Sequence, residues 1–288
     1  MRKRFFLKLT LSFCFFLQVS FLGFSQEKSL LWKISGNGLS KDSYLFGTIH
    51  IICKEDFVMN DRVKKAFEST SKLVMELDMS DPQLMAKMQQ QSLNPGMKNI
   101  QGELSEEDAK VMDVFFMENF GAGLAQIGIL KPFVLSSMAL IKTLPCPETE
   151  SFEGYFTSQA QSLSKPIEGL ETVEIQMGTF DQIPAKVQLD ELVKMIREKS
   201  GAEEFDRMVK SYLSEDIDAL YQIMNQDGMM KEYRGIMLDN RNKAWIPQLQ
   251  EKMAKESLFV AVGSGHLAGE YGVISLLRKA GYQVEPVN

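Results

Sequence analysis

The segment 257–287, SLFVAVGSGHLAGEYGVISLLRKAGYQVEPV, constrains the fold of this chain more than any other stretch. A continuous apolar run is followed by a glycine-rich turn, an amphipathic stretch and a last apolar run, which predicts strand, turn, helix and strand. Because the first run is apolar throughout, the sheet that contains it should be covered on both faces. Ligands of such sheets bind where strands end in glycine-rich turns that enter helices. The pattern therefore places His266 at a candidate site.

The other histidine of the chain has a similar setting. Residues 30–35 and 44–49 are short apolar runs separated by GNGLSKD, which is typical of a hairpin, and His50 lies at or just beyond the end of the second run. Both histidines complete a Gly-x-x-His sequence, GTIH and GSGH. Two interpretations of the glycines are open: they form turns, or they allow a ligand or metal to approach the backbone closely.

A third apolar segment, KLVMELDM at residues 72–79, is predicted to be a strand. Side chains alternate between the faces of a strand, so Glu76 and Asp78 would share one face. A buried carboxylate requires a cation, a hydrogen-bond donor or a metal. Either these carboxylates belong to a functional site, or Asp78 caps the following turn and Glu76 forms a structural salt bridge.

Helices are predicted over most of the remaining chain, and they alternate with strands. A short strand is expected at residues 165–170, and Pro247 is expected to kink or divide a long periodic segment at 229–256. We expect an α/β (mixed α+β) fold in which a central mixed sheet carries the Gly-x-x-His strand ends and is surrounded by many helices. The predicted helices cover residues 60–70, 105–120, 132–143, 148–163, 185–199, 202–212 and 216–226.

The first 25 residues are typical of an export signal, because Arg2, Lys3 and Arg4 precede an apolar stretch and Gly23-Phe24-Ser25 offers a cleavage site. Residues 26–288 would then form a single domain in the periplasm or outside the cell. An uncleaved signal would instead keep the protein associated with a membrane, and after cleavage we expect no membrane insertion. Self-association to a homo-oligomer is left open.

Charge and cysteine content narrow the classes of partner. Removal of residues 1–25 takes away four basic and no acidic residues, which leaves 28 Lys and Arg against 38 Asp and Glu, a formal net charge of −10. Nucleic acids and anionic membranes are therefore poor partners, since both are bound through clustered basic residues.

Cys53 and Cys146 remain after the signal is removed, either as one disulfide or as two buried thiols.

Two histidines and a glutamate form a familiar ligand set for a divalent metal. Such a metal lowers the pKa of bound water and polarises a carbonyl, so His50, His266 and Glu76 predict a hydrolase. A structural role for each histidine is the alternative. The GSGH stretch also suggests Ser264 as a nucleophile, but Val262 stands where the first glycine of G-x-S-x-G is required.

Two further segments contain polar candidates. Glu171 follows the short strand expected at 165–170, and Arg241 and Asn242 lie together in LDNRNKAW on a predicted helix. Arg241 could hold a substrate carboxylate or stabilise a developing oxyanion, with Asn242 beside it for substrate binding. A surface salt bridge between Arg241 and Asp239 or a nearby glutamate is the alternative.

The chain resembles the TraB/GumN family, which includes the TIKI metalloproteases and, more remotely, ChaN-like haem-uptake proteins. The resemblance covers nearly the whole mature chain. It rests on YLFGTIH, VMELDM, IEGLETVEIQ, the Arg-Asn pair and VAVGSGHLAGEYGVISLLRKAGYQVEPV, in that order.

The resemblance implies a metal-dependent peptide hydrolase that uses manganese or cobalt rather than zinc, with His50, His266 and Glu76 in the site. It leaves the roles of Glu171, Arg241 and Asn242 less defined. Our leading expectation is an exported peptidase acting on peptides or proteins, with Glu171 or Asp78 transferring protons. The alternative is a protein that uses the same site to bind haem or another ligand without turnover.

Overall fold

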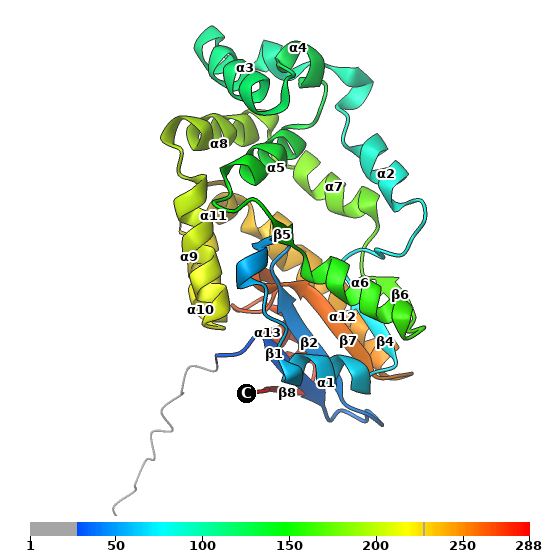
Figure 1. Cartoon of the computed structure of the whole chain (residues 1–288). Helices are drawn as coiled ribbons and strands as arrows, with labels where there is room; N and C mark the ends of the chain where they lie inside the picture. The colour runs from blue at the N-terminus through cyan, green and yellow to red at the C-terminus, as the bar shows by residue number, and fades with distance from the viewer. Residues whose placement is uncertain (1–27, 227) are drawn as a thin grey trace, which may run out of the picture.

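Figure 1 shows the computed structural model, which describes residues 28–226 and 228–288. The fold is mixed α/β, as the sequence predicts, and its centre is a six-stranded mixed sheet with the order β6-β4-β7-β2-β1-β8. The predicted export signal lies outside the described residues. Within them, no helix is both long and apolar enough to cross a membrane. The strands of this sheet are β1 (Leu31–Ser35), β2 (Ser43–Thr48), β4 (Lys72–Met75), β6 (Ile167–Gly169), β7 (Leu258–Gly263) and β8 (Gln283–Pro286).

Four neighbouring strands of the sheet run in the same direction. β7 pairs in parallel with β2 and with β4, and β4 pairs in parallel with β6, whereas β1 is antiparallel to both of its neighbours. The register aligns Thr48 with Gly263 and Met75 with Gly169. The carboxyl ends of β2, β4, β6 and β7 therefore meet at one edge of the sheet, which is where ligands of open α/β sheets bind.

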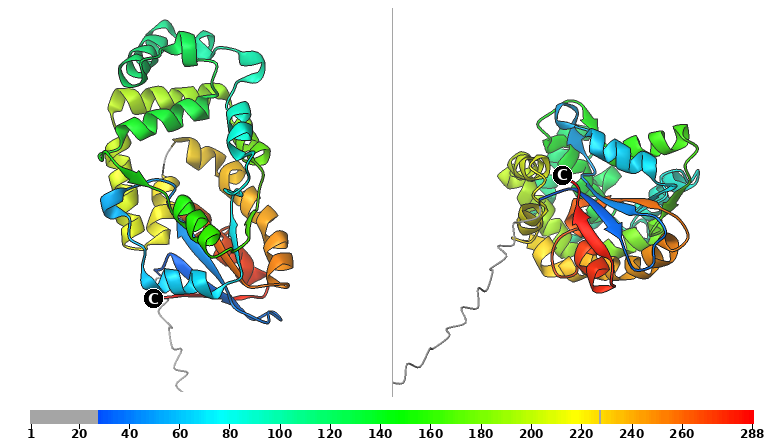
Figure 2. Two further views of the ribbon diagram at one scale, coloured as in Figure 1. Left: turned by 45° about the vertical axis from the view of Figure 1, so that its right-hand side comes forward. Right: turned by 90° about the horizontal axis from the view of Figure 1, so that it is seen from below.

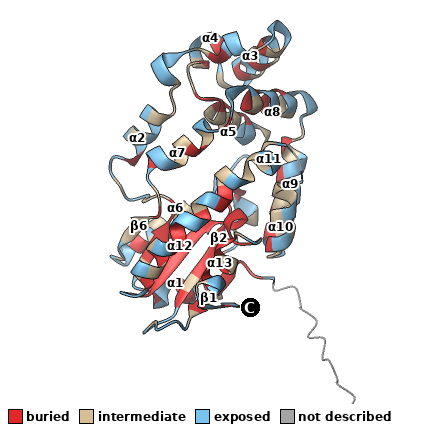
Figure 3. Ribbon diagram, turned by 180° about the vertical axis from the view of Figure 1, so that it is seen from behind, coloured by how far each residue is buried: buried red, intermediate tan, exposed pale blue. Residues whose placement is uncertain are grey.

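Helices cover both faces of the sheet, as the apolar strands require (Figures 1 and 2). α1 (Asp61–Ser69) and α6 (Phe152–Ser162) lie on one face, and α12 (Asn240–Met253) and α13 (Val273–Lys279) lie on the other. All six residues of β7 are buried, and Figure 3 shows the sheet as a continuous buried layer between exposed helix surfaces. Because the sheet is buried on both faces, it is a well-packed support for the residues at its carboxyl edge.

The remaining helices do not share one core. Those that carry Phe116, Leu135 and Leu192 form an apolar cluster of their own above the carboxyl edge in Figure 1, whereas those that carry Phe205 and Leu220 pack on the core of the sheet. Ser105 caps α3, because its hydroxyl accepts a hydrogen bond from the amide of Asp108. The remaining helices are α2 (Leu84–Gln91), α3 (Glu106–Phe120), α4 (Leu124–Ile127), α5 (Pro132–Thr143), α7 (Val173–Asp181), α8 (Ala185–Glu198), α9 (Gly201–Leu213), α10 (Ile217–Met224) and α11 (Gly228–Arg234).

The structure corrects three local predictions. The strand predicted at 72–79 ends at Met75, because the chain turns where the side chain of Asp78 accepts hydrogen bonds from Ser80. The helix predicted to begin at residue 148 begins at Phe152, since β5 (Thr149–Glu150) first pairs with β3 (Ile52–Cys53) in a separate two-stranded sheet.

The third correction concerns Pro247, which does not divide its helix. α12 continues through it from Asn240 to Met253, and the irregular turn of the predicted 229–256 segment lies earlier, in the π-helical residues Gly235–Asp239. A proline inside a helix loses one backbone hydrogen bond and crowds the carbonyl four residues earlier, and the burial of Trp245 and Leu249 on either side of Pro247 offsets this cost.

A disulfide joins Cys53 to Cys146, so the two cysteines are not free thiols. The bond closes a loop with a sequence separation of 93 residues and lies beside the β3–β5 pairing. It therefore fastens the segment that follows His50 to the segment that leads into α6.

Replacement of both cysteines, Cys53→Ser with Cys146→Ser, should lower the free energy of unfolding by about 4 kcal/mol, because a loop of this length loses much of its entropy when it is closed. Urea denaturation with and without dithiothreitol measures this loss. Dithiothreitol should destabilise the unaltered chain and leave the stability of the double variant unchanged. Equal stability of the unaltered chain and the double variant without dithiothreitol would contradict a structural role for the disulfide.

Candidate functional site

The carboxyl edge of the sheet brings together candidate residues that are more than two hundred positions apart in the sequence. His50 follows β2, Glu76 follows β4, Glu171 follows β6 and His266 follows β7. The pairing of β4 with β6 extends one step beyond the strands, because the amide of Glu171 donates to the carbonyl of Glu76 at 2.9 Å. The parallel order of the four strands is therefore what assembles the site.

Glu76 is buried, with 7% of the residue exposed, and its carboxylate is surrounded by donors. Oε1 accepts from the amide of Gly263 at 2.9 Å, and Oε2 accepts from Gln176 Nε2 at 2.9 Å and Arg241 Nη2 at 2.7 Å. Burial would raise the pKa of Glu76, but His266, His50, Arg241 and the Gly263 amide outweigh it and lower the pKa to about 2. Glu76 is consequently a fixed anion.

Arg241, on the first turn of α12, bridges Glu76 to Glu171. Its Nε and Nη2 donate to the two carboxylate oxygens of Glu171 at 2.8 to 3.1 Å, and Nη2 also reaches Glu76. Trp245, one turn further along α12, donates from its indole to Glu171 at 2.9 Å. The expected alternative of a surface salt bridge is wrong, because this guanidinium is buried and held in a fork by two carboxylates.

His266 is held in one tautomer by Asn242. The amide nitrogen of Asn242 donates to the carbonyls of His266 and Tyr271, which fixes its oxygen toward His266 Nδ1 at 2.6 Å. Nδ1 must therefore carry the proton, which leaves a lone pair on Nε2. Burial lowers the pKa of His266 to about 3, despite the opposing charge of Glu76, so the ring is neutral. Its Nε2 lies 3.3 Å from Arg241 Nη1 and 3.8 Å from Glu76 Oε1.

His50 is oriented by a carboxylate in a comparable way, but at the rim of the site. Its Nδ1 lies 2.9 Å from Glu153 Oε1, which also accepts from Thr48 Oγ1 at 2.6 Å. Desolvation by the surrounding atoms lowers the pKa of His50, but the hydrogen bond and charge of Glu153 outweigh it and raise the pKa to about 9. The His50 side chain is 66% exposed, in contrast to the buried His266.

The two Gly-x-x-His glycines are required by close approach. A Cβ on Gly263 would lie 3.3 Å from Glu76 Oε1 and 3.4 Å from His50 Nε2, so both groups converge on this backbone position. A Cβ on Gly47 would lie 2.9 Å from the Leu267 side chain and 3.2 Å from Ser264 Cα. Each glycine thus lets one Gly-x-x-His segment pack against the other.

The donor set partly fits a divalent metal. Both histidines direct Nδ1 to an oxygen of Glu153 or Asn242, which is the second-sphere arrangement that presents Nε2 to a metal, and Glu76 is an ionised carboxylate near both. Nε2 of His266 is available, whereas His50, with its raised pKa, would have to release a proton first. Among the described residues, however, no group of three or more His, Cys, Asp or Glu side chains is spaced to hold a metal ion. The Arg241 guanidinium lies where it contacts the free Nε2 of His266.

Asp78 and Ser264 lie outside this constellation. Asp78 accepts from the amide and hydroxyl of Ser80, so it stabilises the turn after β4, which is the alternative that the sequence left open for it. Ser264 packs against Gly47, and no hydrogen bond joins its hydroxyl to either histidine within the described part of the chain.

Sequence reasoning missed three residues of the site: Glu153, Gln176 and Trp245. Gln176 lies one turn into α7, a helix that was not predicted, and Glu153 lies in the first turn of α6. Their only sequence signals are N-caps, because Thr172 and Ser151 each cap the helix that carries them. Capping predicts a helix start but not which sheet edge that start will face.

Comparison with known proteins gives one family and several distant relatives. The model of the TraB/PrgY/gumN family matches residues 30–286. An uncharacterized protein of Treponema pallidum (strain Nichols) is 22% identical over 88% of this chain and 82% of its own length. Metalloprotease TIKI2 of Danio rerio is 22% identical over 89% of this chain, and metalloprotease TIKI1 of Homo sapiens is 21% identical over 91%. The matches span about three fifths of the length of these TIKI proteins, 60% and 62%. No solved structure matches the chain significantly.

Arg241→Met should lower the free energy of unfolding by about 3 to 5 kcal/mol, because it leaves Glu76 and Glu171 buried without their cation. Urea denaturation of the metal-free protein measures the loss. Arg197→Met is the matched control, since Arg197 also pairs with two carboxylates, those of Glu107 and Asp108, but at the exposed surface. The control should lose less than about 1 kcal/mol; similar losses in the two variants would contradict the buried bridge.

Proposed function

The chain belongs to the TraB/PrgY/gumN family, and we propose that it is an exported, divalent-metal-dependent hydrolase that cleaves peptides. The single observation that carries the proposal is the orientation of the two histidines. Each directs Nδ1 to an oxygen acceptor, and the ionised carboxylate of Glu76 lies beside the free nitrogen of His266 and near Nε2 of His50. Metalloproteases among the relatives support the same class.

In this proposal His50, His266 and Glu76 hold the metal, with manganese or cobalt favoured over zinc. The metal would supply an activated water molecule and polarise the carbonyl of the scissile bond. The charges of the site favour a cation, because Glu76, Glu171 and Glu153 outnumber Arg241 and the protonated His50, and His266 is neutral. A metal would displace the proton of His50 when it binds. His50 is the exposed member of the three ligands, so it is the one that can move most readily toward a bound metal.

The other residues of the site have separate roles in this proposal. Arg241 is held by Glu171 and Glu76, and its Nη1 contacts the carbonyl of Met237 and Nε2 of His266, so all of its donors are engaged. A metal bound by His266 Nε2 would release Nη1 from that nitrogen, and Nη1 could then stabilise negative charge on a substrate oxygen. Glu171 has both oxygens engaged by donors, so we assign it to positioning Arg241 rather than to proton transfer. Asn242 keeps the His266 tautomer, and we assign Asp78 to the turn that follows β4.

The proposal predicts stoichiometric metal in protein purified without chelator, and loss of that metal in the histidine variants. His50→Ala and His266→Ala should each weaken Mn²⁺ affinity at least about 100-fold, because each removes a direct ligand. Asn242→Ala, which removes only the partner of a ligand, should weaken it about 10- to 100-fold. Elemental analysis and isothermal titration with Mn²⁺ measure this, with circular dichroism to confirm folding.

Turnover of a peptide library should follow the metal in the same samples. Chelator should abolish it, and Mn²⁺ should restore it. Ser264→Ala is the control, because it should retain both metal and turnover, whereas a serine hydrolase would lose turnover and react with a fluorophosphonate probe. Full metal content and unchanged turnover in both histidine variants would refute the proposal.

A further inference from the structure

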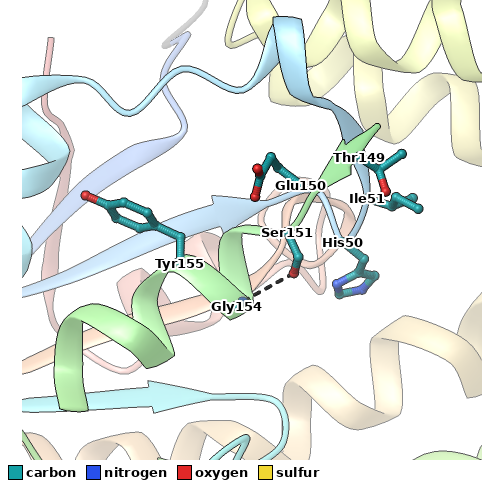
Figure 4. A pocket seen from close by; sticks show the side chains of 7 residues that line it. All are labelled: His50, Ile51, Thr149, Glu150, Ser151, Gly154 and Tyr155. Carbon is teal, nitrogen blue, oxygen red and sulfur yellow. Dashed lines mark hydrogen bonds between the residues drawn. The ribbon is translucent and has the colours of Figure 1, made fainter. Parts of the chain in front are cut away.

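A pocket opens beside His50, and none of the buried site residues Glu76, Arg241 and His266 lines it. It has a volume of about 290 Å³ and lies between β5, the residues after β2 and the first turns of α6 (Figure 4). Figure 4 shows the side chains of Glu150 and Tyr155 on one side of β5 and those of Ile51 and Thr149 on the other, with His50 below Ile51. His50 is thus common to the pocket and to the proposed metal site, so a molecule in this pocket lies next to the reacting bond.

The walls of the pocket are held in place by covalent and backbone bonds. β5 pairs with β3 directly after His50, and the Cys53–Cys146 disulfide fastens the same two segments. The amide of Lys54 donates to the carbonyl of Glu148 at 3.0 Å and extends the pairing by one residue. The position of Glu150 relative to His50 is therefore fixed by the fold and does not depend on a flexible loop.

One carboxylate in this pocket has no counter-charge. Three glutamates lie close together in this segment, and two of them are engaged: Glu148 pairs with Lys54 at 2.6 Å, and Glu153 accepts from His50, Thr48 and Ser151. The Glu150 side chain is exposed and forms no ion pair or hydrogen bond with any described residue. It is also the only pocket-lining carboxylate among the described residues, and no Lys or Arg lines the pocket with it.

The other walls suit the same kind of ligand. Thr149 offers a hydroxyl that no described residue uses, and the Tyr155 ring offers an aromatic face, which attracts cations when they approach it. Ile51 provides apolar surface, which would pack against the methylene groups of a long basic side chain. An anionic or purely apolar group would instead bury Glu150 without a partner, at a cost in free energy.

We infer that this pocket is a substrate subsite for a Lys or Arg side chain, with Glu150 as its counter-charge. The inference rests on the proposed peptidase function, since it assigns the substrate class of that site. Because His50 forms one wall of the pocket, the basic residue of the substrate would lie close to the bond that is cleaved.

Binding of fluorescein-labelled peptide pools to the full chain, measured by anisotropy, tests the subsite separately from turnover. Three ten-residue pools carry Lys, Gln or Glu at one central position, with no other charged residue. The Lys pool should bind about 3- to 5-fold more tightly than the Gln pool, as expected for one partly exposed ion pair. Glu150→Gln should remove that preference, and Glu150→Lys should transfer it to the Glu pool. Glu148→Gln, which alters a neighbouring carboxylate that does not line the pocket, should leave the preference intact.

Equal binding of the Lys and Gln pools by the unaltered chain would overturn the subsite. An equal loss of preference in Glu148→Gln and Glu150→Gln would also overturn it, because it would show a diffuse effect of acidic charge. Turnover of the Lys pool, followed in the same samples with Mn²⁺, separates the two proposals. Turnover without a Lys preference contradicts the subsite alone, whereas a Glu150-dependent preference without turnover supports the subsite and contradicts the hydrolase.

Discussion

The guanidinium of Arg241 between two buried carboxylates is the interaction on which the site depends. Glu76 follows β4 and Glu171 follows β6, so two anions would repel one another at adjacent strand ends without a cation between them. The same guanidinium fixes α12 against the sheet edge, and α12 carries the Asn242 that orients His266. The strand ladders fix β4, β6 and β7 relative to one another, and charge balance at one arginine fixes α12 against their ends.

The two histidines share a motif but differ in environment, and the difference indicates how a substrate would approach. His266 is buried, neutral and fixed by an amide, whereas His50 is exposed and paired with a carboxylate. The interior half of the site is rigid before any ligand binds. The exposed half lies at the mouth of a pocket, so substrate would reach the site past His50 and meet Arg241 and His266 at the inner end.

The fold class and the placement of His50 and His266 at strand ends follow from sequence, because apolar runs that lead into glycine-containing turns are typical of strand ends in such sheets. The meeting of Glu76 and Glu171 at the same edge does not follow, since the sequence pattern placed Glu76 inside a longer strand. The burial of Arg241 could not be predicted in this way. A surface salt bridge between Arg241 and Asp239 was equally compatible with the local sequence. Only the packing of α12 on the sheet shows that Arg241 pairs with Glu76 and Glu171 instead. Glu153 and Gln176 were missed for a related reason, since each reaches the site from a helix whose orientation local sequence does not encode.

The end of β4 at Met75 shows the same limit, because the turn at Asp78 interrupts an alternation of side chains that the sequence alone would continue.

In the proposed site, His50 and His266, from opposite ends of the chain, bind one metal together with Glu76. The most direct measurement is anomalous X-ray diffraction at the manganese absorption edge from crystals grown with Mn²⁺. The claim predicts a single strong anomalous peak about 2.1 Å from the Nε2 atoms of both histidines, with Glu76 as a third ligand. Well-ordered density for all three side chains with no anomalous peak between them would contradict it.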